Sequence, residues 1–341
     1  MKPFTILAVA PWYGANSVRF LVDAMERIGC RAIRIGPVYD QHLGMPWRKE
    51  EVPSVDFILP KESDWHVDSL LDLATARIGA PDLVIISEEN YRNTIVNTEK
   101  VPSVFYSCDG WPQNYDRAGM VKATKNYPNH PLGIRIHPRT EEDPRWTYLA
   151  GACAPWLHKY LGLERDTDFA LMASQYGDRL RICRGLGEAG FTVKFGSAKP
   201  LGYVKIYNRS LCTLHNPQPG EIKWRFFEAA AMGCINISWY TQLFERLGYK
   251  PWIHYYPIHV EEVGDDPWPT TEQMGTAVSE IKNNPRFFKQ IADVARKHTI
   301  ARHTYYHRVV RIFEDLNMEG WAVKAEEKVE EAWKEHLDSY A

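Results

Sequence analysis

Apolar residues along the first third of the chain fall into short runs separated by helical patterns. Residues 4–10 (FTILAVA) are apolar on both faces, as expected for a strand buried within a parallel sheet. Apolar positions then recur with a helical period over 18–28, Gly29 ends that helix, and 31–36 form the next strand. This strand–helix–strand succession is typical of the start of a parallel α/β sheet.

Strand and helix patterns continue beyond this unit, and the loops that follow the strands carry the polar and aromatic groups. Further buried strands are predicted at 55–59, 82–86 and 103–107, and a helix at 67–78. In an open α/β sheet, ligands bind beyond the carboxyl ends of the strands. We therefore expect Pro11–Ser17, Ser87–Tyr91 and Cys108–Trp111 to form one rim of a ligand cleft.

A second α/β series fills the middle of the chain. Its strands are predicted at 169–173, 191–195, 211–215 and 235–238, its helices at 178–186 and 221–232, and later helices at 270–283, 285–299, 303–317 and 320–338. Because a segment rich in Pro and Trp separates the two series, we expect two Rossmann-like domains with a hinge near 155–167. The predicted domains are 1–160 and 161–300, and 301–341 form C-terminal helices that pack back on the first domain.

The helix that precedes Gly233 carries its charge unevenly. Its charged residues lie only in the first half, at Glu221, Lys223, Arg225 and Glu228, whereas alanine and sulfur-containing side chains fill the second half. Helix N-termini favour anions, because their free N–H groups and the helix dipole point outward. The pattern therefore indicates an anion site at this N-terminus, with an ordinary buried helix as the alternative.

The composition is that of an ordinary globular protein, with 341 residues, 45% hydrophobic and 25% charged. A net charge of −2 excludes a protein that is basic all over. The six cysteines form no C-x-x-C pair and several lie in apolar runs, so we expect reduced thiols and a cytoplasmic protein. We expect neither a secretory signal nor a membrane span.

The segment 117–139 stands out by its charge. It contains Arg117, Lys122, Lys125, Arg135 and Arg139 and no acidic residue, with Tyr127 inside it and Tyr115 just before it. One interpretation is a solvated loop with a short helix. The other is a basic, aromatic surface for a polyanionic partner such as a nucleic acid.

Motifs of several common enzyme classes are missing. No G-x-G-x-x-G follows the first strand, where the sequence reads PWYGAN, so the chain lacks the dinucleotide-binding fingerprint of a nicotinamide dehydrogenase. No Walker loop, G-x-S-x-G elbow or zinc-type Cys/His spacing is present either. We expect no resident cofactor.

Residues 225–233 (RFFEAAAMG) resemble the Arg-x-Phe-Glu-Ala-x-Ala-x-Gly motif of the spore-maturation CgeB-like branch of the group 1 glycosyltransferases. The segments 105–109 (FYSCD), 172–186 and 298–311 (HTIARHTYYHRVVR) are similar to the same branch, and the likeness covers most of 100–315. The resemblance implies an α/β protein of the GT-B fold. In that fold two Rossmann-like domains face each other across a cleft, and C-terminal helices cross back.

The resemblance also implies a nucleotide-sugar donor, UDP-linked in our expectation, held by the second domain. A departing diphosphate needs positive charge and N–H donors, and the glutamate at the matching family position usually accepts both ribose hydroxyls. The expected donor-binding residues are Arg179, Arg181, Asn216, Lys223, Arg225 and Glu228. The alternative for Arg225 and Glu228 is a surface ion pair at i, i+3, which contributes little to stability.

The remaining site residues are expected around the reacting sugar. The expected catalytic residues are Asp109, His215 and Glu221, and the expected acceptor-binding residues are Trp12, Tyr13, Trp111, Lys122 and Lys125. Asp109 ends a buried strand and acts as a base or orients the acceptor, or it only caps the turn at Gly110. Six residues separate Glu221 from Glu228 where many relatives have seven, which places Glu221 about 100° away on a helix unless a loop restores its reach.

The expected function is transfer of a hexosyl or pentosyl group from a nucleotide-diphosphate-sugar to an unidentified acceptor, without a metal, as this fold implies. Nucleic acid bound through 117–139, such as hydroxymethylated phage-type DNA, is one acceptor that this interpretation leaves open. Two rival functions remain: a nucleotide-sugar epimerase on the same fold, and a non-catalytic nucleotide-sugar-binding or coat-assembly protein. The oligomeric state is not predicted.

Overall fold

The chain divides into two compact units, each built around a parallel sheet. The computed structural model describes residues 3–12, 17–39, 41–42, 45–46, 54–60, 67–87, 101–107, 132–135, 146–175, 177–217, 222–260 and 268–338. Unit 1 comprises 1–149 and 305–328, and unit 2 comprises 150–304 and 329–341. The chain thus changes unit after residues 149, 304 and 328, where the sequence placed domain boundaries at 160 and 300.

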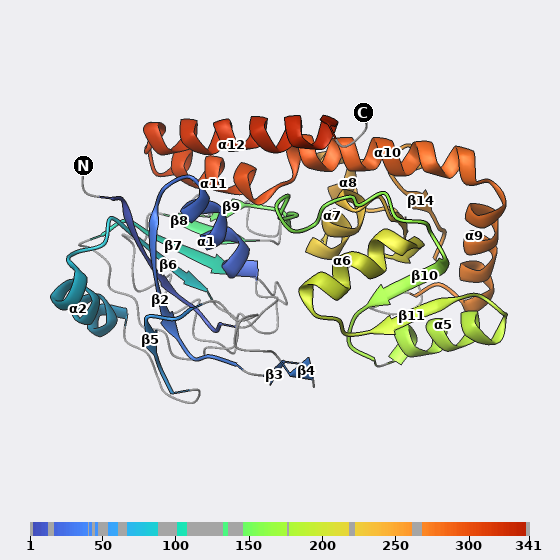
Figure 1. The fold of residues 1–341 in the computed structure, drawn as a ribbon, viewed down its shortest axis with the longest axis horizontal. Coiled ribbons are helices and arrows are strands. Elements are labelled where there is room, and N and C mark those ends of the chain that lie inside the picture. Colours follow the sequence, from blue (N-terminus) through green and yellow to red (C-terminus); the bar gives the residue numbers. More distant parts are fainter. Residues whose placement is uncertain are drawn as a thin grey trace. The chain divides into compact units, whose positions relative to one another are not determined.

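Unit 1 is organised by a seven-stranded parallel sheet with the order β5-β2-β1-β6-β7-β8-β9 (Figure 1). The strands are β1 (Thr5–Val9), β2 (Arg31–Gly36), β5 (Phe57–Ile58), β6 (Leu83–Ser87), β7 (Ser103–Ser107), β8 (Leu132–Arg135) and β9 (Trp146–Tyr148), beside an antiparallel pair, β3 (Gln41–His42) and β4 (Met45–Pro46). Its helices are α1 (Ser17–Arg27), α2 (Val67–Ile78), α11 (Tyr305–Asp315) and the first part of α12 (Glu319–Asp338).

The interior strand β1 is buried along its whole length and is apolar except for Thr5. Leu7 and Val9 share a buried core with Leu71 and Ala74 of α2. Side chains of successive strand residues point to opposite faces, so Ile6 and Ala8, which are also buried, face the other side. The prediction of a strand buried on both faces is confirmed.

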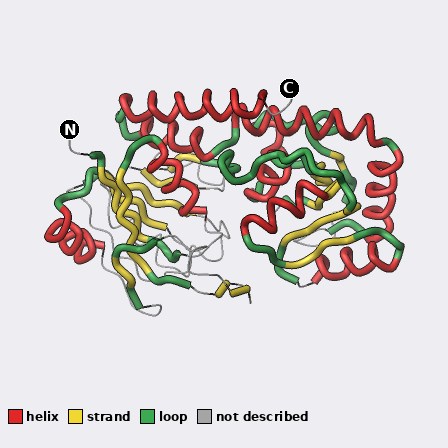
Figure 2. The backbone as a smooth tube through the Cα atoms, in the orientation of Figure 1, coloured by secondary structure: helices red, strands yellow, loops and turns green. Residues whose placement is uncertain are grey.

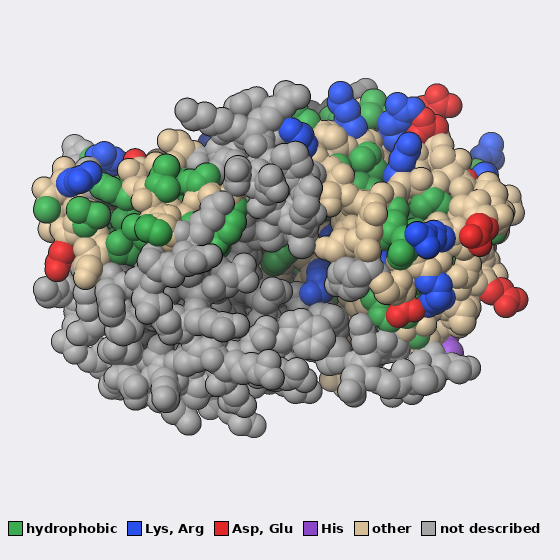
Figure 3. All heavy atoms as spheres, turned by 90° about the horizontal axis from the view of Figure 1, so that it is seen from below, with side chains coloured by type: hydrophobic (Ala, Val, Ile, Leu, Met, Phe, Trp, Pro, Cys, Tyr) green, Lys and Arg blue, Asp and Glu red, His purple; other side chains and the backbone are tan. Residues whose placement is uncertain are grey.

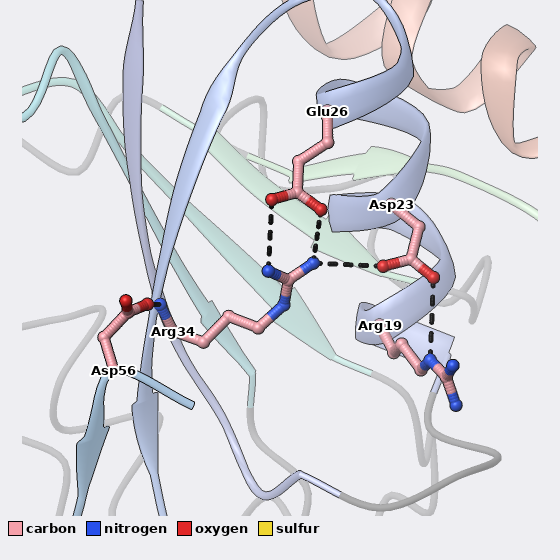
Figure 4. Close-up of polar contacts among 5 residues, drawn as sticks. All are labelled: Arg19, Asp23, Glu26, Arg34 and Asp56. Carbon is pink, nitrogen blue, oxygen red and sulfur yellow. Dashed lines mark hydrogen bonds and ion pairs between the residues drawn. The ribbon is translucent and has the colours of Figure 1, made fainter. Parts of the chain in front are cut away.

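A buried arginine ties α1 to β2 in unit 1 (Figure 4). The guanidinium of Arg34 donates to both carboxylate oxygens of Glu26, at 3.1 and 2.5 Å, and to Asp23 at 3.1 Å. Burial alone would lower the pKa of Arg34, but these two carboxylates raise it above the ordinary value. The network therefore keeps a charged group stable beneath the helix.

Glu26→Gln is expected to lower the free energy of unfolding of unit 1 by about 1 kcal/mol, because it removes the charge from one partly exposed partner of Arg34. Urea unfolding followed by circular dichroism measures the loss. Asp72→Asn, an exposed carboxylate on α2, is the matched control. Equal midpoints for the two variants would contradict the prediction.

Unit 2 is organised by a five-stranded parallel sheet with the order β11-β10-β12-β13-β14. The strands are β10 (Thr167–Met172), β11 (Val193–Gly196), β12 (Ser210–Leu214), β13 (Ile235–Ser238) and β14 (Tyr256–Pro257). The helices are α5 (Gly177–Glu188), α6 (Pro200–Arg209), α7 (Trp224–Ala231), α8 (Gln242–Arg246), α9 (Thr271–Asn283), α10 (Pro285–Arg302) and the end of α12. Figure 2 shows this alternation of strands and helices along the tube.

Two helical layers enclose this second sheet. Leu186 of α5 and Val278 of α9 pack with Phe169 in one core. On the other face, Val204 of α6 and Ala229 of α7 pack in a second core. Loops at the carboxyl ends of β10 and β12 therefore lie at the same edge of the sheet, next to the start of α7.

The C-terminal end of α7 is fixed by a glycine and an arginine. Gly233 has φ +70°, a left-handed conformation that side chains other than hydrogen disfavour. The guanidinium of Arg165 donates to the carbonyls of Met232 and Gly233, at 3.2 and 2.6 Å, and to Tyr207 at the end of α6. The glycine stop predicted from the sequence is confirmed.

The surface agrees with a chain that is close to electroneutral. On the face drawn in Figure 3, Lys and Arg side chains of unit 2 are interspersed with Asp and Glu. The described cysteines are free and buried, and burial raises the pKa of the Cys30, Cys183 and Cys234 thiols to about 12. Among the described residues, no helix is both long and apolar enough to span a bilayer.

Candidate functional site

The candidate site lies where β12 ends and α7 begins. Strand β12 leads into His215 and Asn216, and the chain returns at Lys223, the N-cap residue of α7. The Lys223 side chain makes no capping hydrogen bond, and the first turn of α7 contains no acidic residue. Within the described residues, neither the cap side chain nor an acidic side chain of the first turn accepts from the first N–H groups, which makes this helix start suited to an anion.

His215 holds the two ends of this loop together. Its Nε2 accepts the Lys223 N–H at 3.2 Å, so Nδ1 carries the proton and lies 3.2 Å from the Ser238 hydroxyl. Burial, reinforced by the positive charges of Arg225 and Lys223, lowers its pKa well below 6.5, so the ring is neutral. Both nitrogens are engaged within the fold, which favours a positioning role over the catalytic role expected from the sequence.

Asn216 is a buried amide without a partner. Asn216 is 8% exposed, and among the described residues neither its amide oxygen nor its amide nitrogen has a hydrogen-bond partner. A buried amide in this condition costs free energy, and such groups are normally satisfied by protein, water or ligand. Asn216 thus offers one donor group and one acceptor at the site.

Arg225 is the second residue of α7 and is half-buried. Among the described residues it has no hydrogen-bond or ion-pair partner. Its charge lowers the pKa of His215 and acts on the hydroxyls of Tyr203 and Tyr207, so the guanidinium lies near these side chains. A partly desolvated cation without an acidic partner is suited to bind an anion, because the charge of the anion compensates the desolvation of the cation.

Glu228 lies one turn further along α7 and is 7% exposed. The Tyr203 hydroxyl donates to its Oε2 at 2.5 Å, and His158 Nε2 lies 3.6 Å from its Oε1. The alternative of a surface Arg225–Glu228 ion pair is wrong, because Glu228 is buried and takes these partners instead.

His158 reaches Glu228 from the segment that precedes β10. Its Nδ1 accepts the Ala154 N–H at 3.0 Å, so its proton sits on Nε2 and faces the carboxylate. Burial lowers the pKa of His158, while the Glu228 carboxylate opposes that shift. For Tyr203, burial and then the carboxylate raise the pKa well above 10, so its hydroxyl stays a donor.

The two arginines expected from α5 have other neighbours. The Arg179 guanidinium lies over the Trp268 ring, 5.9 Å from its centroid. Arg181 is exposed, pairs with Asp178 at 2.8 Å and donates to the Pro269 carbonyl at 3.1 Å. The structure therefore brings together His215, Arg225 and Glu228, and it ties Arg181 to a surface pair.

Trp12 corrects an expectation from the sequence. Its side chain is fully buried, and its indole N–H donates to the Ile35 carbonyl at 3.0 Å. The ring thus closes the core after β1, and the prediction that Trp12 contacts an acceptor is wrong. The predicted residues Asp109, Glu221, Tyr13, Trp111, Lys122 and Lys125 lie outside the described residues, and their roles stay predictions.

Gly151 is a site residue that the sequence did not reveal. A Cβ at this position would lie 2.9 Å from Trp224 Cα and 3.0 Å from Trp224 N. The segment before β10 therefore passes directly against the first turn of α7, and only glycine permits this approach. The residue leaves no local sequence signal, because its constraint comes from a helix far along the chain.

Gly151→Ala is expected to lower the melting temperature by a few degrees, equivalent to about 1–2 kcal/mol, because the new methyl group pushes on the α7 backbone. Gly187→Ala, which meets no atom within 4 Å, is the matched control. Differential scanning fluorimetry of both variants measures the difference. A Gly151→Ala protein as stable as the control would contradict the prediction, because it would show that α7 shifts to accommodate the methyl group at no cost in stability.

Comparison with known proteins places this site in a fold. HepE from Anabaena, solved in complex with UDP and glucose, is 12% identical, covers 92% of this chain and 99% of its own, and superposes with a TM-score of 0.60. A sucrose-phosphate synthase from Thermosynechococcus elongatus is 11% identical, with coverages of 92% and 98% and a TM-score of 0.58. A glycosyltransferase from Rickettsia africae is 10% identical, with coverages of 98% and 100% and a TM-score of 0.59. The fold is GT-B.

The GT-B fold expected from the sequence is thus confirmed. Residues 156–314 also match a glycosyl transferase-like family, and this segment holds every described site residue from His158 to Glu228. No curated protein sequence matches the chain. The CgeB-like branch, a finer assignment than this match, stays a prediction.

Proposed function

We propose that the protein is a glycosyltransferase that binds a UDP-linked sugar at the N-terminus of α7 and transfers the sugar to an acceptor. In this reaction the acceptor oxygen bonds to C1 of the sugar while the bond from C1 to the β-phosphate oxygen breaks. The acceptor hydroxyl loses its proton and UDP departs. The family match over 156–314 and the UDP-glucose complex of HepE support this choice of reaction and donor.

The observation that carries the proposal is that the two polar side chains Arg225 and Asn216 lack hydrogen-bond partners among the described residues. The one is a half-buried cation and the other a buried amide, and within the described residues neither has a hydrogen-bond partner. Negative charge develops on the diphosphate as it departs, and fixed cations and N–H donors stabilise that charge. A diphosphate at the α7 N-terminus satisfies both side chains at once.

In this proposal, different side chains bind different parts of the nucleotide. Arg225 and the α7 N–H groups neutralise the diphosphate, and this charge makes a divalent metal unnecessary in our proposal. Glu228, held by Tyr203 and His158, accepts the ribose hydroxyls. The transferred group is a hexose or pentose.

A thermal-shift screen with uridine, adenosine, guanosine and cytidine diphosphates tests the proposal. A ligand that binds only the folded protein raises the melting temperature by mass action. UDP is expected to give the largest shift, and the shift is expected to survive EDTA. Equal shifts for all four bases would remove UDP from the proposal, and no shift at all would remove the nucleotide.

The acceptor stays a prediction. Lys122 and Lys125 of the basic segment 117–139 lie outside the described residues, and no comparison points to DNA. If nucleic acid binds there, its affinity falls steeply with salt. A gel shift at low salt that shows no retention would end that idea.

A further inference from the structure

Unit 2 exposes a tight turn with an aromatic residue at its tip. Four consecutive residues, Lys250 to Ile253, are exposed, with Trp252 and Ile253 each 46% accessible. Trp252 has φ 62°, a left-handed conformation that costs free energy for a bulky side chain. Its N–H donates to the Tyr255 carbonyl at 2.9 Å, which closes the turn. The turn thus holds Trp252 in a strained backbone conformation with its indole ring partly exposed to solvent.

The first turn of α10 adds a second exposed aromatic ring to the same surface. Phe287 is 48% accessible, and its ring lies 5.0 Å from that of Phe288. Phe288 lies 5.8 Å from Tyr256, which in turn lies 4.9 Å from Trp252. Phe288 and Tyr256 are buried, so they form a rigid base from which the two exposed rings project.

The charged side chains near these rings are mostly basic, and the exposed carboxylate of Glu280 accepts the Tyr256 hydroxyl at 2.8 Å. The side chains of Lys250 and Arg286 are exposed and have no ion-pair partner among the described residues. Lys282 and Lys289 lie nearby in sequence, but Asp168 and Asp293 neutralise them at 2.9 and 2.7 Å. Within the described part of unit 2, Lys250 and Arg286 are therefore cations without an ion-pair partner beside three exposed apolar side chains.

This surface directly precedes β14, the edge strand of the second sheet. Tyr256 is the first residue of β14 and pairs with Ile237, which in turn pairs with Leu214 at the carboxyl end of β12. His215 and Asn216 follow the carboxyl end of β12.

We propose that the surface formed by Lys250–Ile253, Arg286 and Phe287 binds the face of a membrane that contains anionic phospholipids. Indole and phenyl rings favour the boundary between headgroups and acyl chains, where the ring is desolvated and the polar edge stays wet. Lys250 and Arg286 match the negative headgroups, and each such cation strengthens binding to an anionic surface. Binding is peripheral and requires no spanning helix.

A lipid surface fits these residues better than a protein partner does. The centre of a protein interface is usually a continuous apolar patch from which lysine is depleted. Here the apolar tips stand apart and alternate with cations along the chain, as Lys250, Trp252 and then Arg286, Phe287. This spacing suits separate insertion of each ring between lipid headgroups.

Vesicle co-sedimentation of the full chain tests the proposal. Vesicles of phosphatidylcholine with about 30% phosphatidylserine are expected to bind at least about tenfold more tightly than pure phosphatidylcholine, and binding should weaken between about 0.05 and 0.5 M NaCl. Equal binding to both vesicles, or no binding to either, would overturn the proposal.

Trp252→Gly separates lipid binding from folding. Glycine adopts φ 62° without strain, so this variant is expected to stay folded by circular dichroism and to lose at least about tenfold in vesicle affinity. Leu201→Ala, which removes a 73% exposed side chain at the start of α6, is the control and is expected to bind vesicles like the parent. If Trp252→Gly instead abolishes concentration-dependent dimerisation in analytical ultracentrifugation while vesicles are never bound, the surface is a protein interface and the proposal fails.

Discussion

Arg225→Ala is expected to weaken UDP binding about 10- to 100-fold, equivalent to about 1.5–3 kcal/mol, because it removes a charge-assisted contact to the diphosphate. Uridine, which has no phosphate, is expected to lose little. Isothermal titration calorimetry with the two ligands measures both effects. The selective loss follows from the position of the guanidinium, which lies near His215 and at the helix start.

Arg181→Ala is the matched control for that experiment. Arg181 is also an arginine of unit 2, but it is exposed and already paired with Asp178. Its removal is expected to leave both affinities close to those of the parent, since exposed pairs contribute little. Equal losses of affinity for UDP and uridine in Arg225→Ala, or a larger loss in Arg181→Ala, would show that Arg225 does not bind the diphosphate.

Glu228→Ala is expected to weaken uridine and UDP alike, by about 1–3 kcal/mol each, because both ligands carry the ribose hydroxyls that the carboxylate accepts. Ligands that lack those hydroxyls, such as 2′,3′-dideoxyuridine, are expected to bind parent and variant equally. Calorimetry with this pair of nucleosides isolates the ribose contact. A variant that loses affinity for dideoxyuridine to the same extent would show a structural effect only.

Tyr203→Phe sharpens the test of Glu228. The Tyr203 hydroxyl donates to Oε2 of Glu228, so its removal frees one oxygen but also removes a group that orients the carboxylate. If the orientation matters, Tyr203→Phe weakens uridine binding and adds nothing when Glu228 is already alanine. Additive losses in this double-mutant cycle would mean that the two side chains act independently.

Local sequence patterns predict the parts of this fold whose constraints are local. Strand β1 is apolar on both faces, and Gly233 ends α7 at a left-handed conformation, as the sequence indicated. The start of α7 was placed too early, because Glu221 and Lys223 look like helix residues, whereas the helix begins at Trp224 and Lys223 is its N-cap. Such boundaries depend on how the preceding loop returns.

Helix α6, which carries the Tyr203 partner of Glu228, was not predicted from the sequence. Its sequence, PLGYVKIYNR, contains a glycine and three β-branched or aromatic residues in its first seven positions, which gives a weak helical signal. Pro200 at its first turn fits a helix start, however, and Tyr203 reaches Glu228 from there. Strands β8 and β9 were missed because they are only four and three residues long, which is too short to leave a clear pattern in the sequence.

The site residues were predictable by type but not by environment. A charged helix start pointed to Arg225 and Glu228, but the sequence could not show that Glu228 is buried against His158 and Tyr203. Trp12 looked like a loop aromatic after a strand, but its indole finds the Ile35 carbonyl across a neighbouring strand. These contacts join residues distant along the chain, and only the folded structure sets them.

Hydrogen–deuterium exchange with and without UDP tests the central claim most directly, because it asks where the nucleotide binds. Saturating UDP is expected to slow exchange in peptides that cover 200–217 and 222–232, which hold Tyr203, Asn216 and Arg225. Exchange in peptides of α1 and α2 in unit 1 serves as the internal reference. Protection of the α7 start in the parent, and its loss in Arg225→Ala at the same UDP concentration, is the predicted result. Protection confined to unit 1, or equal protection in the variant, would contradict a nucleotide site at the N-terminus of α7.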